Sequence, residues 1–140
     1  MSKGEAPRGH AFEVKDSGKR VAFASGMLRD TDEGKPRFDL LDREFLKRWA
    51  LHMAKGAEKY GEENWRKAEG EAELRRFRAS AFRHLIQWLN DERDEDHAAA
   101  VAFNVSAAEM VRGRLELAMH HAQLEAQREL EFGGTPRDQR

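Results

Sequence analysis

Apolar residues spaced as on one face of an α-helix dominate the middle of this chain. The first such run begins after Asp42, a plausible N-cap, and continues at spacings of three, four and seven residues until Gly61, where a helix is expected to end. The same spacing predicts a second helix over about 74–90 and a third from about residue 95 to 115. The pattern therefore favours an all-α fold.

The flanking segments lack this period. Residues 1–27 are predicted to be an irregular arm with a possible short strand near 21–24, and residues 28–42 a loop, because they contain Gly34 and Pro36. The stretch 115–130 is helical by propensity but thinly apolar, so it could pack on a partner subunit. Its neighbour Gly113 is the only candidate break, and the helix is expected to end at Gly133. We thus expect an arm over 1–27, a helical domain over 28–132 and a flexible tail over 133–140.

Composition limits the chemistry that the chain can carry. Cysteine is absent, which excludes disulfides, thiolate zinc sites and thiol nucleophiles, so any metal must be held by oxygen or imidazole. The formal net charge of -1 argues against nonspecific binding of nucleic acid. No apolar run is long enough for a membrane span and no signal-peptide core occurs, so we expect a cytoplasmic protein.

An acidic run, NDERDEDH, joins the second and third predicted helices. On a helix, Glu92, Glu95 and Asp96 would share one face and could hold one divalent ion. Alternatively, acids collect in a first helical turn because the helix dipole favours them there. His97 and Asn104 follow on an otherwise apolar stripe, and burial requires partners for both. They form either a hydrogen-bonded core pair or part of a polar site beside the carboxylates.

Three further patterns could bind a nucleotide. In GAEKYGEENW, an amide beside a tryptophan can read and stack a base, although a Glu and Lys run is often only a solvated face. Arg83 stands between Phe82 and Leu85, so we expect it to border the core and either to pair with the acidic junction or to bind phosphate. A loop with mixed charges could close over a phosphate or simply be solvated; its charged residues are Arg29, Asp30, Lys35, Arg37 and Asp39.

Taken in order, RDTDEGKPRFDLL, GAEKYGEENW and FRHLIQWLNDERDEDHAAAVAFN resemble the motif series of the phage dATP/dGTP diphosphohydrolases, the MazZ branch of the MazG-like nucleotide pyrophosphohydrolases. The resemblance covers roughly residues 25–112. It implies a MazG-like all-alpha NTP pyrophosphatase helical bundle that assembles as a homo-oligomer, a dimer or tetramer. It also implies Mg²⁺ or Mn²⁺ in a carboxylate-rich cradle.

The reaction implied by this resemblance is hydrolysis of dGTP and dATP to the monophosphate and pyrophosphate, in the service of viral DNA built with 2-aminoadenine. Glu92 and Asp96 would be catalytic, and Glu58, Glu92, Glu95 and Asp96 would hold metal. The EExxE triad of the wider family is absent, and Glu58, Glu62 and His84 are candidates to replace it. The expected substrate-binding residues are Lys35, Arg37, Asp39, Lys59, Asn64, Trp65, Arg83, His84 and Asn104. The alternatives are a pyrophosphatase of broad NTP specificity, a non-enzymatic helical interaction module and, more weakly, a nucleic-acid-binding protein.

Overall fold

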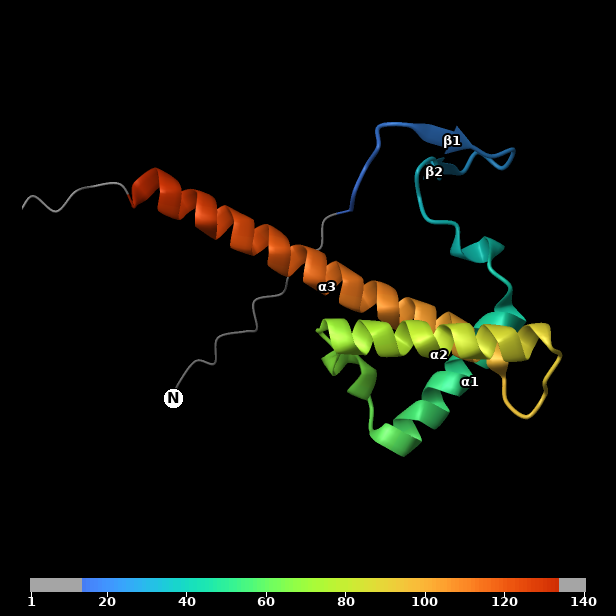
Figure 1. Ribbon diagram of the computed structural model, residues 1–140. Helices are drawn as coiled ribbons and strands as arrows, with labels where there is room; N and C mark the ends of the chain where they lie inside the picture. Colours follow the sequence, from blue (N-terminus) through green and yellow to red (C-terminus); the bar gives the residue numbers. More distant parts are fainter. Residues whose placement is uncertain (1–13, 134–140) are drawn as a thin grey trace, which may run out of the picture. The chain divides into compact units, whose positions relative to one another are not determined.

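The computed structural model describes residues 14–133, which form two compact units (Figure 1). The hairpin unit ends at Leu40 and the helical unit begins at Leu41. Residues 1–13 of the predicted arm and residues 134–140 of the predicted tail lie outside the described residues. The three-part division of the chain stays a prediction.

The hairpin unit contains two short antiparallel strands, β1 (Arg20–Ala22) and β2 (Leu28–Asp30). The turn between them is closed by hydrogen bonds between Phe23 and both Gly26 and Met27, and Gly26 has a φ of 86°, a backbone conformation that glycine adopts without strain. β1 overlaps the possible strand near 21–24. The prediction of a loop from residue 28 is wrong at its start, because this turn folds β2 back onto β1. A 3₁₀ turn, η1 (Phe38–Leu40), follows.

The first helix of the helical unit, α1 (Arg43–Tyr60), has the predicted bounds. The Asp42 side chain accepts a hydrogen bond from the Phe45 amide at 3.1 Å and so caps the first turn. Gly61 ends the helix with a φ of 92°, and its amide donates to the Ala57 carbonyl. A second 3₁₀ turn, η2 (Asn64–Lys67), leads to the next helix.

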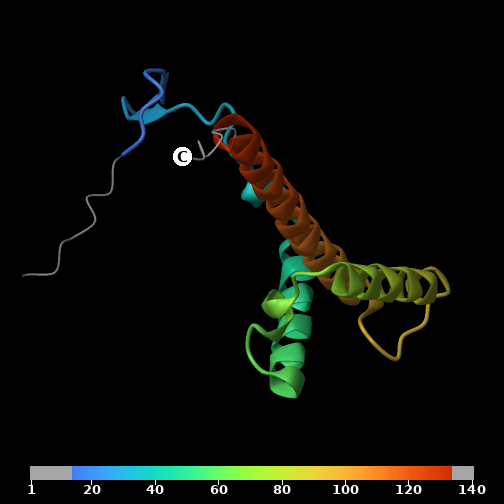
Figure 2. The ribbon, with the colours of Figure 1, turned by 60° about the vertical axis from the view of Figure 1, so that its left-hand side comes forward.

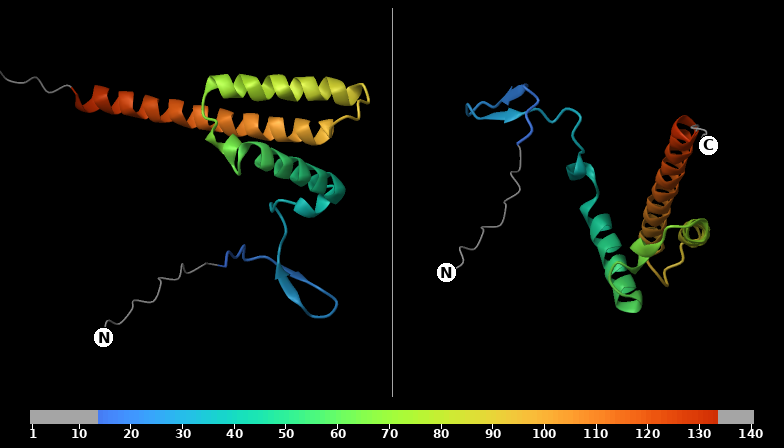
Figure 3. Two further views of the ribbon diagram at one scale, coloured as in Figure 1. Left: turned by 90° about the horizontal axis from the view of Figure 1, so that it is seen from below. Right: turned by 90° about the vertical axis from the view of Figure 1, so that its left-hand side faces the viewer.

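The other two helices, α2 (Glu71–Leu89) and α3 (His97–Phe132), lie antiparallel along one another (Figure 3, left). α1 packs on the first half of α3, and the second half of α3 extends past both neighbours (Figure 2). Gly113 does not break α3, which is one continuous helix. The all-α prediction is therefore confirmed.

The core lies between α2 and α3. Leu74, Ala108 and Val111 are buried there together with Ala68, and Phe77, Met110 and Leu115 pack around them. Small side chains let the two helices approach closely, since Ala99, Ala100 and Ala107 are fully buried. Within residues 14–133 no helix has the length and hydropathy needed to cross a membrane.

Candidate functional site

The connection between α2 and α3 holds the acidic run. α2 ends in a Schellman motif: Asp91 takes the left-handed conformation at φ 57°, its amide donates to the Trp88 carbonyl, and the Glu92 amide donates to the Gln87 carbonyl at 3.0 Å. Residues 91–96 are consequently not helical. The expectation that Glu92, Glu95 and Asp96 share a helix face is wrong, because the chain leaves the helix at this turn.

Asp96 joins α1 to α3. Its carboxylate accepts two hydrogen bonds from the Arg48 guanidinium, at 2.8 and 2.7 Å, and a third from the Ala99 amide as the N-cap of α3. The Arg48 hydrogen bonds are the main cause that lowers the pKa of Asp96 to about 2. Both oxygens therefore face protein donors. A catalytic or metal-binding role for Asp96 stays a prediction.

His97 is buried at the start of α3 and has a partner on each ring nitrogen. Its Nε2 lies 2.8 Å from an Asp94 oxygen, and its Nδ1 lies 2.9 Å from Nδ1 of His84. Because a carboxylate only accepts, Nε2 of His97 carries the proton, and the lone pair of its Nδ1 accepts a hydrogen bond from Nδ1–H of His84. The pair considered between His97 and Asn104 does not form, since the buried Asn104 amide donates to the Ala100 carbonyl.

Three imidazoles gather near these acids. The side chain of His84 on α2 is 13% exposed, and its Nδ1 lies 3.9 Å from a Glu95 oxygen. Burial lowers the pKa of His84, although Glu95 opposes the effect. Burial likewise lowers the pKa of His52 on α1. Near neutral pH the rings of His84 and His52 are therefore uncharged, which is the form that binds metal ions.

Two groups of donor atoms could hold a cation. Ligand atoms of His84, Glu95 and His97 lie within 4.8 Å of one another, and so do those of Glu92, Asp94 and His97. Near the second group, the Gln87 amide donates to Glu92, and its buried Oε1 has no partner among residues 14–133. A mixed imidazole and carboxylate set fits a divalent cation, and it suits Mn²⁺ better than Mg²⁺, which prefers oxygen alone.

The structure thus brings together Glu92, Glu95 and His84, three of the predicted site residues. Sequence reasoning did not propose His97 or Asp94 as ligands, although the polar His97 on an apolar stripe was a usable signal. Glu58 lies exposed in the last turn of α1 and belongs to neither donor group. Its role as a ligand stays a prediction.

The η2 turn carries Asn64 and Trp65 beside a cavity of about 290 Å³. Arg114 of α3 fixes this turn, because its Nη1 donates to the carbonyls of Arg66 and Ala68. The Arg66 guanidinium lies 4.5 Å from the centre of the Trp65 ring system. The cavity is lined by Asn64, Trp65, Lys67, Ala68, Glu73 and Phe77.

Phe103 of α3 lies between two residues that line this cavity and His52 on α1. Its ring centre lies 6.0 Å from those of both Trp65 and Phe77, edge-on in each case, and 5.8 Å from that of His52. A chain of aromatic contacts therefore runs from the η2 turn through Phe103 to His52 on α1.

Two predicted phosphate-binding cations are exposed. Lys59 lies in the last turn of α1 with its ammonium 5.0 Å from the Tyr60 ring centre, and its hydrogen bond with Tyr60 is the main cause that raises the pKa of Lys59. Arg83 donates to Ser80 and forms no ion pair with the acidic junction in the described part of the chain. Its neighbour Phe82 is 67% exposed, so the expectation that Arg83 borders the core is wrong.

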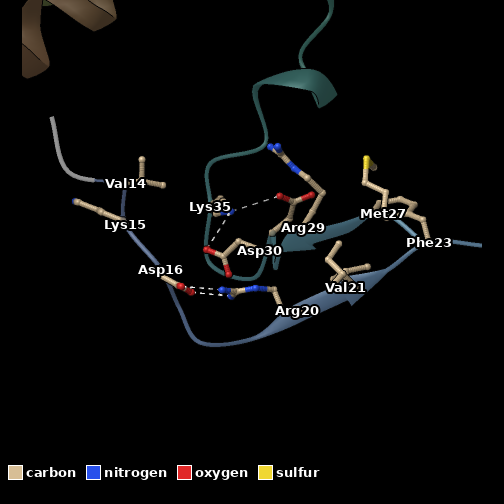
Figure 4. A pocket seen from close by; sticks show the side chains of 12 residues that line it. Val14, Lys15, Asp16, Arg20, Val21, Phe23, Met27, Arg29, Asp30 and Lys35 are labelled. Atoms are coloured by element: carbon tan, nitrogen blue, oxygen red, sulfur yellow. Dashed lines mark hydrogen bonds and ion pairs between the residues drawn. The ribbon is translucent and has the colours of Figure 1, made fainter. Parts of the chain in front are cut away.

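The hairpin unit has its own open concavity of about 800 Å³ (Figure 4). Its charges are largely paired within the unit: Lys35 lies 3.9 Å from an Asp30 oxygen, and Arg20 binds Asp16 at 2.7 Å. In the segment that follows, the Arg37 guanidinium donates two hydrogen bonds to Asp39. That Lys35, Arg37 and Asp39 bind substrate stays a prediction.

Comparison with known proteins gives one match. The family model described as "dATP/dGTP diphosphohydrolase, N-terminal" matches residues 25–120, a range that includes both donor groups and the η2 cavity. No curated protein matches the chain, and no solved structure does.

Proposed function

The chain belongs to the dATP/dGTP diphosphohydrolase family, and from this premise we propose that it hydrolyses dGTP and dATP to the monophosphate and pyrophosphate with the help of a divalent cation. As a member of this family it is a hydrolase, so a purely non-enzymatic interaction module is the wrong alternative. The observation that carries the finer proposal is the pair of donor groups around His97.

We infer that His84, Glu95 and His97 hold the cation. A divalent cation bound there supplies charge neutralisation for the phosphate oxygens and increases the acidity of water. Asp94 acts on His97 from behind: it keeps the proton on Nε2 and so directs the Nδ1 lone pair into the site. Burial keeps His84 uncharged for the same purpose.

The reaction also requires a group that accepts a proton from the attacking water and cations that neutralise the triphosphate. Water attacks the α-phosphorus, the bond from that phosphorus to the bridging oxygen breaks, and pyrophosphate leaves. Because both oxygens of Asp96 face Arg48 and Ala99, Glu92 is the better of the two predicted catalytic carboxylates to accept the proton from water. Lys59 and Arg83, both exposed, are available for the phosphates.

Product analysis tests this reaction. The purified chain is incubated with dGTP and Mn²⁺, and the products are separated by anion exchange. We expect dGMP and pyrophosphate in equal amounts; dGDP with phosphate, or no turnover, would contradict the proposal. A parallel panel of ribonucleotides separates purine deoxynucleotide hydrolysis from broad NTP specificity.

The Asp94→Asn variant tests the metal centre. Because Asp94 orients His97, we expect this change to weaken Mn²⁺ binding by about 10- to 100-fold in calorimetry, and turnover with it. Glu109→Gln, which alters an exposed carboxylate on α3 outside both donor groups, is the matched control and should leave Mn²⁺ binding unchanged. Equal Mn²⁺ affinity in all three proteins would contradict the role of Asp94 in orienting His97 toward the cation.

Three finer expectations stay predictions. The chain is expected to form a homo-oligomer, a dimer or tetramer, and light scattering would measure its molar mass in solution. The cytoplasmic location and the service to 2-aminoadenine DNA both require observation in the host cell.

A further inference from the structure

We propose that the η2 cavity binds the nucleotide base and that Glu73 makes it selective for guanine over adenine. This inference rests on the proposed function and adds the base preference, which neither the family description nor the donor groups specify.

The spacing along α2 places the cavity at a suitable distance from the donor groups. Glu73, Phe77 and His84 lie four and seven residues apart, so they share one face of the helix. Two helical turns separate Phe77 in the cavity wall from His84 in the donor group, about 10.5 Å along the axis. This separation is comparable with the reach of a nucleotide from its base to its α-phosphate.

The cavity walls suit a flat heterocycle. Trp65 and Phe77 line it, and both rings are held edge-on by Phe103 behind them. Arg114 holds the η2 turn from α3, so Trp65 and Asn64 are presented by an ordered backbone. Aromatic side chains on a fixed support provide apolar contact area for a base at small entropic cost.

The polar groups of the cavity match the edge of guanine. The Glu73 carboxylate is exposed, and no ion pair or hydrogen bond engages it within the part of the chain that the structure describes. It lies against Gly70, where one of its oxygens would be 2.9 Å from an added Cβ. Its two oxygens can accept the N1–H and the 2-amino N–H of guanine together, whereas adenine presents a bare N1 lone pair there. The Asn64 amide and the Lys67 ammonium can donate to the guanine O6.

A local role for Glu73 is less well supported. A glutamate three residues after an N-cap often returns a hydrogen bond to the N-cap amide, here that of Gly70. Among residues 14–133 this bond is not formed. The carboxylate is therefore available to a ligand.

The test measures kcat/KM for dGTP, dATP and dITP, which lacks the 2-amino group, with the parent chain and Glu73→Gln. We expect the parent to prefer dGTP over both others by about 10- to 100-fold, because dITP loses one charge-assisted hydrogen bond to Glu73 and dATP loses both. Glu73→Gln should lower the ratio of dGTP to dATP at least tenfold. Glu69→Gln, a nearby exposed acid outside the cavity, should keep the parent ratio.

Calorimetry with dGMP and dAMP in the absence of metal gives a second readout, in which the parent should bind dGMP more tightly. Turnover of dGTP and dATP at equal efficiency, unchanged in Glu73→Gln, would overturn the guanine inference and leave the proposed function standing. Failure to hydrolyse any of the three nucleotides would instead refute the proposed function, and the dGMP and dAMP affinities would still decide the base preference.

Discussion

The contact between Arg48 and Asp96 gives the sharpest test of how the helical unit is held together. Asp96 caps α3, a contribution of about 1 kcal/mol, and accepts a bidentate pair from Arg48 across 48 residues of sequence. The Arg48 side chain is 52% exposed, so solvent screening limits the ion pair to about 1 kcal/mol. Asp96→Ala should therefore lower the free energy of unfolding by about 2 kcal/mol, and Arg48→Ala by about 1 kcal/mol.

The double variant should cost little more than Asp96→Ala alone, because the second change removes a partner that is already lost. Urea denaturation followed by circular dichroism at pH 7 would then give a coupling energy near ~1 kcal/mol. Asp96→Asn keeps the cap and should cost only about 1 kcal/mol. Glu109 and Arg112, an exposed pair within one turn of α3, serve as the control cycle, with a coupling of at most ~0.5 kcal/mol.

A coupling energy below ~0.3 kcal/mol would refute this reasoning, since the bidentate geometry would then contribute nothing. The Asp96→Asn variant also tests the prediction that Asp96 is catalytic. If Asp96→Asn left stability unchanged and reduced turnover by about 100-fold or more, the carboxylate would serve chemistry rather than structure.

Three further changes probe the rest of the molecule. Leu74→Ala should cost about 2–4 kcal/mol in urea denaturation, because Leu74 is buried in the small core; a loss under ~1 kcal/mol would mean that the site collapses around the gap. Asp91→Gly should raise stability by up to ~1 kcal/mol, since φ is 57° there, and destabilisation would contradict this. In the hairpin unit, the Arg20 hydrogen bond lowers the pKa of Asp16, so its stabilising effect is present above about pH 4 and is lost as the pH falls further. The folded fraction of the hairpin, measured from the intensity of the Val21 amide signal, should fall with that loss, and a folded fraction that stays constant down to pH 2 would contradict the prediction.

The helices were predictable where their limits are set locally. Asp42 and Gly61 bound α1 because a capping carboxylate and a glycine with positive φ act on the nearest turn alone. The end of α2 near residue 90 was also predicted. The acidic run after it was given the geometry of a helix, whereas Asp91 in the left-handed conformation turns the chain out of α2, and α3 begins only at His97.

The candidate site was predictable only in part. Glu92 and Glu95 are visible in the sequence as part of an acidic run. The contact between His84 and His97 is not, because it depends on how α2 and α3 pack after a connection without helical structure. Glu73 carries no sequence signal at all. Only the return of α2 along α3, with Phe103 between the turn and the helix, places it in a cavity with Trp65.

The backbone of α3 is one continuous helix, but only its first part packs against another helix. Up to Leu115 its inner face is buried by α2, whereas from Glu116 to Phe132, roughly 25 Å, every side chain is exposed in the single chain. Amide hydrogens in the first part should exchange with solvent only when the whole unit opens, and those in the second by local fraying from the end. Deuterium uptake along α3 should therefore change abruptly near Leu115, and protection that continued to Phe132 would reveal a partner lying on that exposed half.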